Sequence, residues 1–285
     1  MAIITDSQGA SDSQAPKLRQ QRIDRAFRPR RAGWWQPVVV FFVLVGVAYL
    51  VALYYDKVRG FNFVVPYPHQ ILAAFVDPLY QVQLVAQLGQ SALVAVTGLA
   101  IAIIIGMVWA ILMAQAKWIE RSLFPYAVFL QCIPILALVP LIASLYGYAF
   151  ASRVIVAAFI AIFPMVSNTL FGLQSVDKGQ RELFKLQGVG RWTLLTKLQF
   201  PAALPAIFVG LRTAAGLSVI GAIVGDQFFQ QGKPGLGVLI QVSNARLNGP
   251  YTFATIIVAS LLGVAVFLFF GWLGRLTIGK WYDAN

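Results

Sequence analysis

The sequence predicts an all-α integral membrane protein with about six transmembrane helices. Of its 285 residues, 59% are hydrophobic and only 11% are charged, and the mean hydropathy is +0.75. A soluble domain carries about 25% charged residues, so this chain could not cover its surface with polar groups in water. Its apolar residues are also gathered into long charge-free runs, which favours one membrane domain over two soluble ones.

These charge-free runs have the length that a membrane-spanning helix needs. A helix rises 1.5 Å per residue, so about 20 apolar residues cross a hydrocarbon layer of about 30 Å. Six candidate spans result, at residues 37–55, 84–114, 122–147, 153–172, 206–229 and 250–274. The fifth is the weakest, because Arg212 and Asp226 interrupt it. Pro134, Pro140 and Pro164 predict kinked or broken helices in the third and fourth spans.

Basic residues set the orientation of the spans. With the N-terminus inside, six spans leave residues 1–36, 115–121, 173–205 and 275–285 in the cytoplasm. These segments hold 16 of the 22 lysines and arginines, as the positive-inside rule requires. The net charge of +12 is therefore a topology signal rather than a sign of nucleic-acid binding, since no recognition motif accompanies it. We expect a multi-pass membrane protein with both termini in the cytoplasm.

This topology divides the chain into four segments. They are a basic N-terminal arm (1–36), a first transmembrane helix with its outer loop (37–84), a membrane-spanning core (85–275) and a cytoplasmic tail (276–285). The first helix is predicted to be retained, because its leader is too long and its apolar core unlike that of a cleaved signal peptide. The outer loop contains three prolines and predicts a hairpin or a surface helix.

The sequence offers no set of catalytic or metal-binding residues. A single cysteine excludes an internal disulfide, and a single histidine leaves no metal cluster to build. Gly274–Trp281 has the spacing G-x-x-x-x-G-K, but Trp281 stands where a P-loop needs a serine or threonine for magnesium. We therefore expect that this chain is not an enzyme and binds no cofactor itself.

Four polar residues inside or at the outer ends of the spans are candidates for a solute pathway. They are Gln131, Asn168, Asp226 and Gln227. Unpaired polar side chains in lipid cost free energy, so such residues are expected to pair or to line a polar path. Asp226 lies about 21 Å along the helix from Arg212, too far for an ion pair, and is either interfacial or part of the path. We expect Arg212 to snorkel towards the cytoplasm in a structural role.

A basic segment at residues 177–200 separates the fourth and fifth spans. Its first half, Asp177–Gln187, contains good helix formers with one apolar side, and glycines at 188 and 190 then permit a sharp turn. A second helical piece, Trp192–Phe200, is followed by prolines that lead into the next span. Two short amphipathic helices at an angle would form a cytoplasmic knob. Its composition alone suits docking on a lipid surface as well as docking on a protein.

The same segment resembles the cytoplasmic signature of the membrane-spanning subunits of binding-protein-dependent ABC importers. That signature reads E-A-A, three residues, G, nine residues, then I-x-L-P. Glu182 and Gly188 have the first spacing, and Leu198-Gln199-Phe200-Pro201 stands at the second. Leu183 and Phe184 replace the two alanines, which changes the size of the knob.

Further matches point to the nitrate/sulfonate/taurine branch of these permeases. "PAALPAIFVGLRTAAG" (Pro201–Gly216) is similar to its proline-rich segment, and "LQCIPILALVPLIASLYG" (Leu130–Gly147) resembles its "iP-x-x-a-x-x-P-L" segment. "FPMVSNTLFGL" (Phe163–Leu173) and "PGLG" (Pro234–Gly237) resemble two others, and Asp226 stands where the branch commonly has Glu. The resemblance covers about residues 85–275.

The resemblance implies a type I importer permease fold in which residues 177–200 form a coupling helix that seats in a separate ATPase. Carried over to this sequence, coupling falls on Arg181, Glu182, Leu183, Phe184, Gly188, Trp192, Leu198 and Pro201. ATP and magnesium would be bound by the ATPase subunits. The other implied partners are a second permease copy, in a homodimer, and a periplasmic or lipid-anchored solute-binding protein.

The function implied is uptake of a small solute, either an anion such as nitrate, sulfonate or bicarbonate, or a vitamin precursor. One alternative is a secondary transporter or channel that works without ATP. It would need buried ionisable groups to couple ions, and only Asp226 qualifies. The other is a membrane-anchored structural or receptor subunit that transports nothing.

Overall fold

The computed structural model describes residues 35–60 and 64–279, and every regular element in these ranges is a helix. The fold class predicted from composition is thereby confirmed. The predicted N-terminal arm lies outside the described residues up to position 34, as does the tail beyond position 279. The chain divides after Val51 into two compact units. The first described helix, α2 (Trp35–Tyr54), continues into a π-helical turn, η1 (Tyr55–Arg59).

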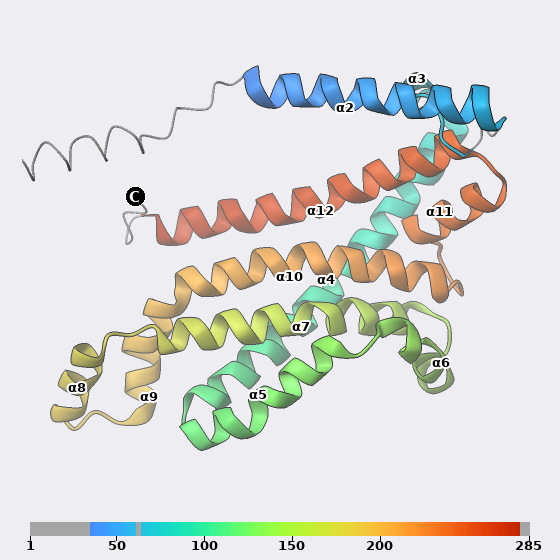
Figure 1. Cartoon of the computed structure of the whole chain (residues 1–285). Coiled ribbons are helices and arrows are strands. Elements are labelled where there is room, and N and C mark those ends of the chain that lie inside the picture. Colours follow the sequence, from blue (N-terminus) through green and yellow to red (C-terminus); the bar gives the residue numbers. More distant parts are fainter. Residues whose placement is uncertain (1–34, 61–63, 280–285) are drawn as a thin grey trace, which may run out of the picture. The chain divides into compact units, whose positions relative to one another are not determined.

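The larger unit, from Ala52 onwards, contains the remaining helices (Figure 1). They are α3 (Pro68–Ala74), α4 (Pro78–Ala114), α5 (Lys117–Cys132), α6 (Ile135–Tyr146), α7 (Phe150–Gln174), α8 (Lys178–Leu186), α9 (Arg191–Leu194), the π-helical turn η2 (Leu195–Gln199), α10 (Phe200–Phe228), α11 (Leu236–Ala245) and α12 (Gly249–Ile278).

Five helices in the described chain are long and apolar enough to cross a membrane. They are Trp35–Val58, α4, α7, the continuous helix Arg191–Phe228, and α12. The pair α5 and α6 makes a sixth if it is counted as one span, although its two halves are bent by 94°. The structure thus agrees with about six spans, and it adds α11, a ten-residue helix that the sequence did not predict.

The prolines have different effects on the helices. The break predicted at Pro134 is present, because α5 ends at Cys132 and α6 begins at Ile135. Pro140 and Pro164, in contrast, lie inside helices that continue past them. The second helical piece predicted at Trp192–Phe200 is present, and it is continuous with the next span, since one helix runs from Arg191 to Phe228. The π-helical turn η2 lies just before Pro201.

Small residues bring the central helices α4, α7 and α10 into close contact. Ala157 of α7 lies between Gly98 of α4 and Gly221 of α10: a Cβ on Gly98 would lie 2.6 Å from the Cβ of Ala157. A Cβ on Gly106 would lie equally close to the Cβ of Met165, at a second contact further along α4 and α7. Residues without bulk are therefore required where these backbones meet, as is usual for helices packed in membranes.

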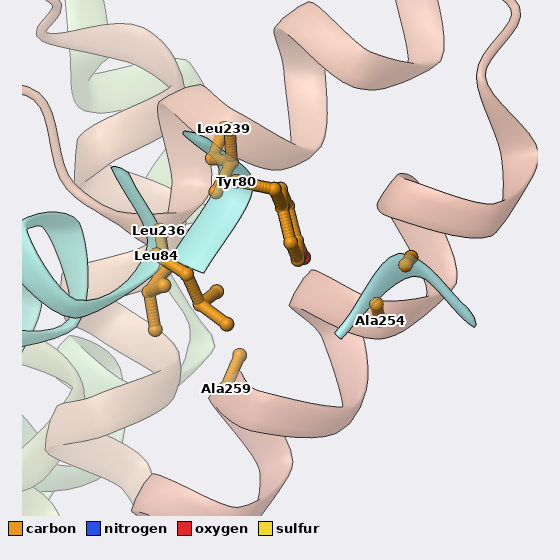
Figure 2. Close-up of a cluster of buried hydrophobic side chains, with 7 residues drawn as sticks. Tyr80, Leu84, Leu236, Leu239, Ala254 and Ala259 are labelled. Atoms are coloured by element: carbon orange, nitrogen blue, oxygen red, sulfur yellow. The ribbon is translucent and has the colours of Figure 1, made fainter. Parts of the chain in front are cut away.

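An apolar cluster fixes α11 at the end of the bundle (Figure 2). It joins residues of α4, α11 and α12, namely Tyr80, Leu84, Leu236, Leu239, Ala254 and Ala259. The hydroxyl of Tyr80 lies 2.9 Å from the hydroxyl of Thr255, so its one polar atom is satisfied within the cluster. Burial of α11 thus depends on residues distant in sequence, which explains why local patterns did not reveal it.

Candidate functional site

The predicted knob is present as α8, α9 and η2, residues 178–199, and projects from one end of the bundle (Figure 1). The carboxylate of Asp177 caps α8 by accepting a hydrogen bond of 2.7 Å from the backbone N–H of Gly179. Helix α8 ends in a turn at Gly188, whose φ of 68° is the left-handed conformation that glycine adopts without strain. A second helical stretch then leads directly into α10.

Helix α8 contains no buried side chain, although three of its nine residues are large and apolar. Leu183 is 55% exposed and Leu186 is 86% exposed, and Trp192 on α9 is 73% exposed. The knob is held to the bundle instead by Leu195, which packs with residues of α7 and α10 in a small buried cluster. Leu195 thus anchors the second half of the knob, and the knob presents an apolar surface.

The structure brings the predicted coupling residues together on the knob or at its junction with α10. Helix α8 carries Arg181, Glu182, Leu183 and Phe184; the turn carries Gly188; α9 carries Trp192; η2 carries Leu198; and Pro201 lies in the first turn of α10. Lys185 and Arg191 are exposed beside them. Positive charge therefore accompanies the apolar surface of the knob.

The four predicted pathway residues, in contrast, are not brought together. Gln131 is exposed on α5 and lines a cavity of about 280 Å³, whereas Gln227 lines a second cavity of about 720 Å³. Asn168 lies between α7 and α10, where its amide Nδ2 donates to the carbonyl of Pro164 at 2.9 Å. Asp226 is fully buried and lines neither cavity.

Leu217 of α10 lines both cavities. The smaller cavity lies beside the break between α5 and α6 and includes the rings of Phe159 and Phe163 with the amide of Gln131. None of the described residues that line it is charged. The larger cavity lies between α10, α11 and α12 and is mostly apolar.

Arg153 is the buried partner that sequence reasoning missed. It begins the predicted fourth span at 153–172, where no partner was expected for it; it lies in the first turn of α7, is 1% exposed, and forms an ion pair of 3.2 Å with Asp226. A buried carboxylate needs such a partner. The signal was available, because Arg153 begins the span that precedes the knob and Asp226 ends the span that follows it.

The other intramembrane charge is Arg212. The helix spacing predicted that it does not pair with Asp226, and the structure agrees, because Asp226 pairs with Arg153. The guanidinium carbon of Arg212 lies 4.3 Å from the centre of the Phe267 ring on α12, a cation–π contact. A side chain on Gly271 would collide with this guanidinium, so that glycine makes room for it. These contacts match the structural role expected for Arg212.

Residues 102–278 match the family described as binding-protein-dependent transport system inner membrane component. The chain belongs to this family. It is a multi-pass membrane permease subunit of an ATP-driven ABC importer, and the predicted resemblance and function are confirmed. The family is one of transport permeases rather than enzymes, and its members work with ATPase and solute-binding partners.

Similar curated proteins serve several solutes. The formylaminopyrimidine transport permease ThiX of Halalkalibacterium halodurans is 32% identical over 80% of this chain and 89% of its own length. The riboflavin transport system permease RibX of Chloroflexus aurantiacus is 34% identical over 59% of this chain and 62% of its own. The nitrate import permease NrtB of Synechocystis sp. is 29% identical over 64% of this chain and 65% of its own.

Proposed function

We propose that the knob of this permease, residues 178–199, is the coupling element that docks on a separate ATPase subunit. The supporting observation is the exposure of Leu183, Leu186 and Trp192 on an element that Leu195 fixes to the bundle. Leucine and tryptophan side chains of this exposure gain free energy when a partner covers them. ATP and magnesium are bound by that partner, and this chain supplies no catalytic group.

The orientation follows from the same assignment. A knob that meets a cytoplasmic ATPase places residues 115–121, the knob and both chain ends in the cytoplasm, in agreement with the excess of lysine and arginine there. The membrane is then the bacterial inner membrane, and the opposite end of the bundle faces the solute-binding protein. Two copies of this chain, each with its own knob, form the transporter.

For the solute we propose a planar heteroaromatic compound related to a vitamin precursor, in preference to a small inorganic anion. The cavity beside the helix break combines Phe159 and Phe163 with the amide of Gln131, and its described lining carries no charge. Aromatic faces and one amide suit a neutral ring with hydrogen-bonding edges better than a strongly hydrated anion. Relatives named for formylaminopyrimidine and riboflavin transport agree with this choice.

Copurification with the ATPase tests the docking assignment. Leu186→Glu should reduce the amount of ATPase retained by the permease in detergent at least fivefold, because it places a charge in the apolar contact. Leu247→Glu is the matched control: Leu247 is 60% exposed and lies in the turn after α11, near the opposite end of the bundle. Equal retention by both variants would contradict the assignment and favour lipid docking of the knob.

Uptake into proteoliposomes tests the transport assignment. Vesicles that contain the permease, its ATPase and its solute-binding protein should take up a labelled formylaminopyrimidine. This uptake should require ATP on the side of the membrane where the ATPase is bound. Nitrate in excess should not compete with that uptake. Movement of solute under an ion gradient with no ATPase present would instead favour a secondary transporter.

A further inference from the structure

The knob is carried by two antiparallel arms, α7 and the helix Arg191–Phe228. Glycines hold the arms close together along their whole length. A Cβ on Gly172 would lie 2.9 Å from the carbonyl oxygen of Ala203, near the knob. A Cβ on Gly221 would lie 2.7 Å from the Cα of Ala157, towards the other end. Backbones in such contact cannot slide past each other without repacking, so the arms move as one body.

Arg153 and Asp226 join the two arms at the end opposite the knob. Arg153 lies in the first turn of α7, about 32 Å of helix from the end of α7 that meets the knob, and Asp226 lies in the last turn of α10, about 39 Å of helix from its start. Their ion pair is fully buried, and Ser91 of α4 donates a hydrogen bond of 2.5 Å to the second oxygen of Asp226. The pair therefore connects α4, α7 and α10 at a single point.

Arg153 also holds the loop that follows α10. Its Nε donates to the carbonyl of Phe229 at 2.5 Å, Nη2 donates to Gln231 at 2.8 Å, and Nη1 donates to Lys233 at 2.7 Å. Three alternate carbonyls of loop 229–235 thus point at one buried guanidinium. The Gln231 and Lys233 side chains, in contrast, are exposed.

The end of this loop is fixed as well. The backbone N–H of Leu236 donates to the hydroxyl of Ser91 at 2.8 Å. Any side chain on Gly235 would collide with the carboxylate of Asp226, so the backbone itself packs against the ion pair. The loop is thus held at one end by Arg153 of α7 and at the other by Ser91 of α4 and the carboxylate of Asp226.

We propose that Arg153 and Asp226 are positioning residues for transport, which fix loop 229–235 to the outer ends of the arms so that displacement of the knob reaches the opposite face. This inference rests on the proposed coupling function of the knob. It assigns Asp226 to this clamp rather than to the solute pathway. The exposed residues 230–234 of the loop then change position on the outer face when the ATPase changes its conformation.

The decisive variant replaces both charges, Arg153→Met with Asp226→Leu. No buried charge is left unpaired, so the protein should insert and fold, but the three loop carbonyls lose their donor. We expect basal ATPase activity of the reconstituted complex to stay within twofold of wild type. The maximal rate of uptake and the stimulation by loaded solute-binding protein should fall at least tenfold, while the KM for uptake stays within twofold.

Ser91→Ala is the second variant, which keeps the ion pair and removes the anchor of Leu236. It should lower the maximal uptake rate two- to fivefold, and it decides the question alone if the double variant does not fold. Thr255→Val is the matched control, because it removes a buried hydrogen bond with Tyr80 near the same end and leaves the loop anchored. Its uptake should remain at the wild-type rate.

Two results would overturn the proposal. One is uptake at the wild-type rate by both the double variant, where folded, and Ser91→Ala; the other is a change in KM with an unchanged maximal rate, which would place Asp226 in the solute pathway. A variant with Gly188→Val, measured alongside, separates the two levels of inference. Normal ATP-driven uptake by Gly188→Val would refute the coupling function itself, whereas its loss beside normal uptake in the clamp variants would refute only the clamp.

Discussion

Gly221 of α10 packs directly on the backbone of Ala157 in α7, where a Cβ would lie 2.7 Å from the Cα of the alanine. Real Cβ atoms do not approach other atoms this closely, so the contact requires a glycine. Ala157 in turn touches Gly98 of α4 on another side. One small residue thereby sets the spacing of three spans, and through them the rigidity of the arms that carry the knob.

Gly221→Val should therefore destabilise the permease by about 1 to 3 kcal/mol, the usual cost of overpacking a tight interior. The matched control is Gly216→Val on the same helix, since a Cβ at Gly216 meets nothing within 4 Å. Thermal unfolding of the two purified variants in the same detergent gives the comparison. Equal melting temperatures would show that α7 and α10 are not packed as described.

The ion pair makes a separate prediction about stability. Arg153→Met alone leaves the carboxylate of Asp226 buried without its charged partner and should cost about 3 to 5 kcal/mol. Adding Asp226→Leu should recover most of that loss, because the second substitution removes the stranded charge. Unfolding of the single and double variants by denaturant measures both steps. If the double variant is less stable than the single one, the two charges do not act as a buried pair.

The number of spans and the knob could be predicted from the sequence because each depends on a local pattern. Charge-free runs mark the spans, and Glu182, Gly188 and Pro201 stand at a recognisable spacing. The partner of Asp226 could not be found in this way, since Arg153 is 73 positions away and looks like any arginine at a span boundary. The clue lies in the topology instead: Arg153 begins one span and Asp226 ends the next, so antiparallel spans bring them to the same end of the bundle.

The predicted pathway residues also show what a local pattern cannot decide. Polarity inside a span identified Gln131 and Asp226 as equals, but the first lines a cavity and the second is enclosed by protein. A polar residue in a span satisfies its hydrogen bonds either through the solute path or through other residues, and composition does not distinguish the two. Only the packing around each side chain does.

Acid should weaken the contact between the start of α4 and α12. The hydroxyl of Tyr251 donates to Asp77 at 2.6 Å, and with the backbone N–H of Leu79 it holds the pKa of the Asp77 carboxyl below its ordinary value of 3.8. A lowered folded-state pKa contributes stability that is complete above the unfolded pKa. That contribution is lost as the pH falls through the folded one.

We expect the melting temperature of the wild type to fall below about pH 4. The fall should be smaller in Tyr251→Phe. The phenylalanine variant cannot donate to the carboxylate, so its acid-side loss should be smaller than that of the wild type. Tyr126→Phe, at a tyrosine that is 64% exposed on α5, is the control and should follow the wild-type curve. Parallel curves for all three proteins would mean that the Tyr251–Asp77 bond is not formed.

The turn of the knob offers the sharpest test of coupling. Gly188 has a φ of 68°, and a Cβ there would meet nothing within 4 Å. Any effect of substitution must therefore come from the backbone conformation rather than from a clash. Asparagine tolerates the left-handed region, whereas a β-branched residue strongly resists it. The series Gly188→Asn and Gly188→Val thus changes the direction of α8 without altering what surrounds the turn.

We expect Gly188→Asn to retain at least half of the ATP-driven uptake and Gly188→Val to lose at least 90% of it, with equal amounts of both inserted in the membrane. Gly190→Ala is the internal control, because Gly190 has an ordinary φ of −65° and open space around it. Retention of the ATPase on the purified variants should follow the same order as uptake. A Gly188→Val variant that binds its ATPase and transports normally would contradict the assignment of the knob as the coupling element.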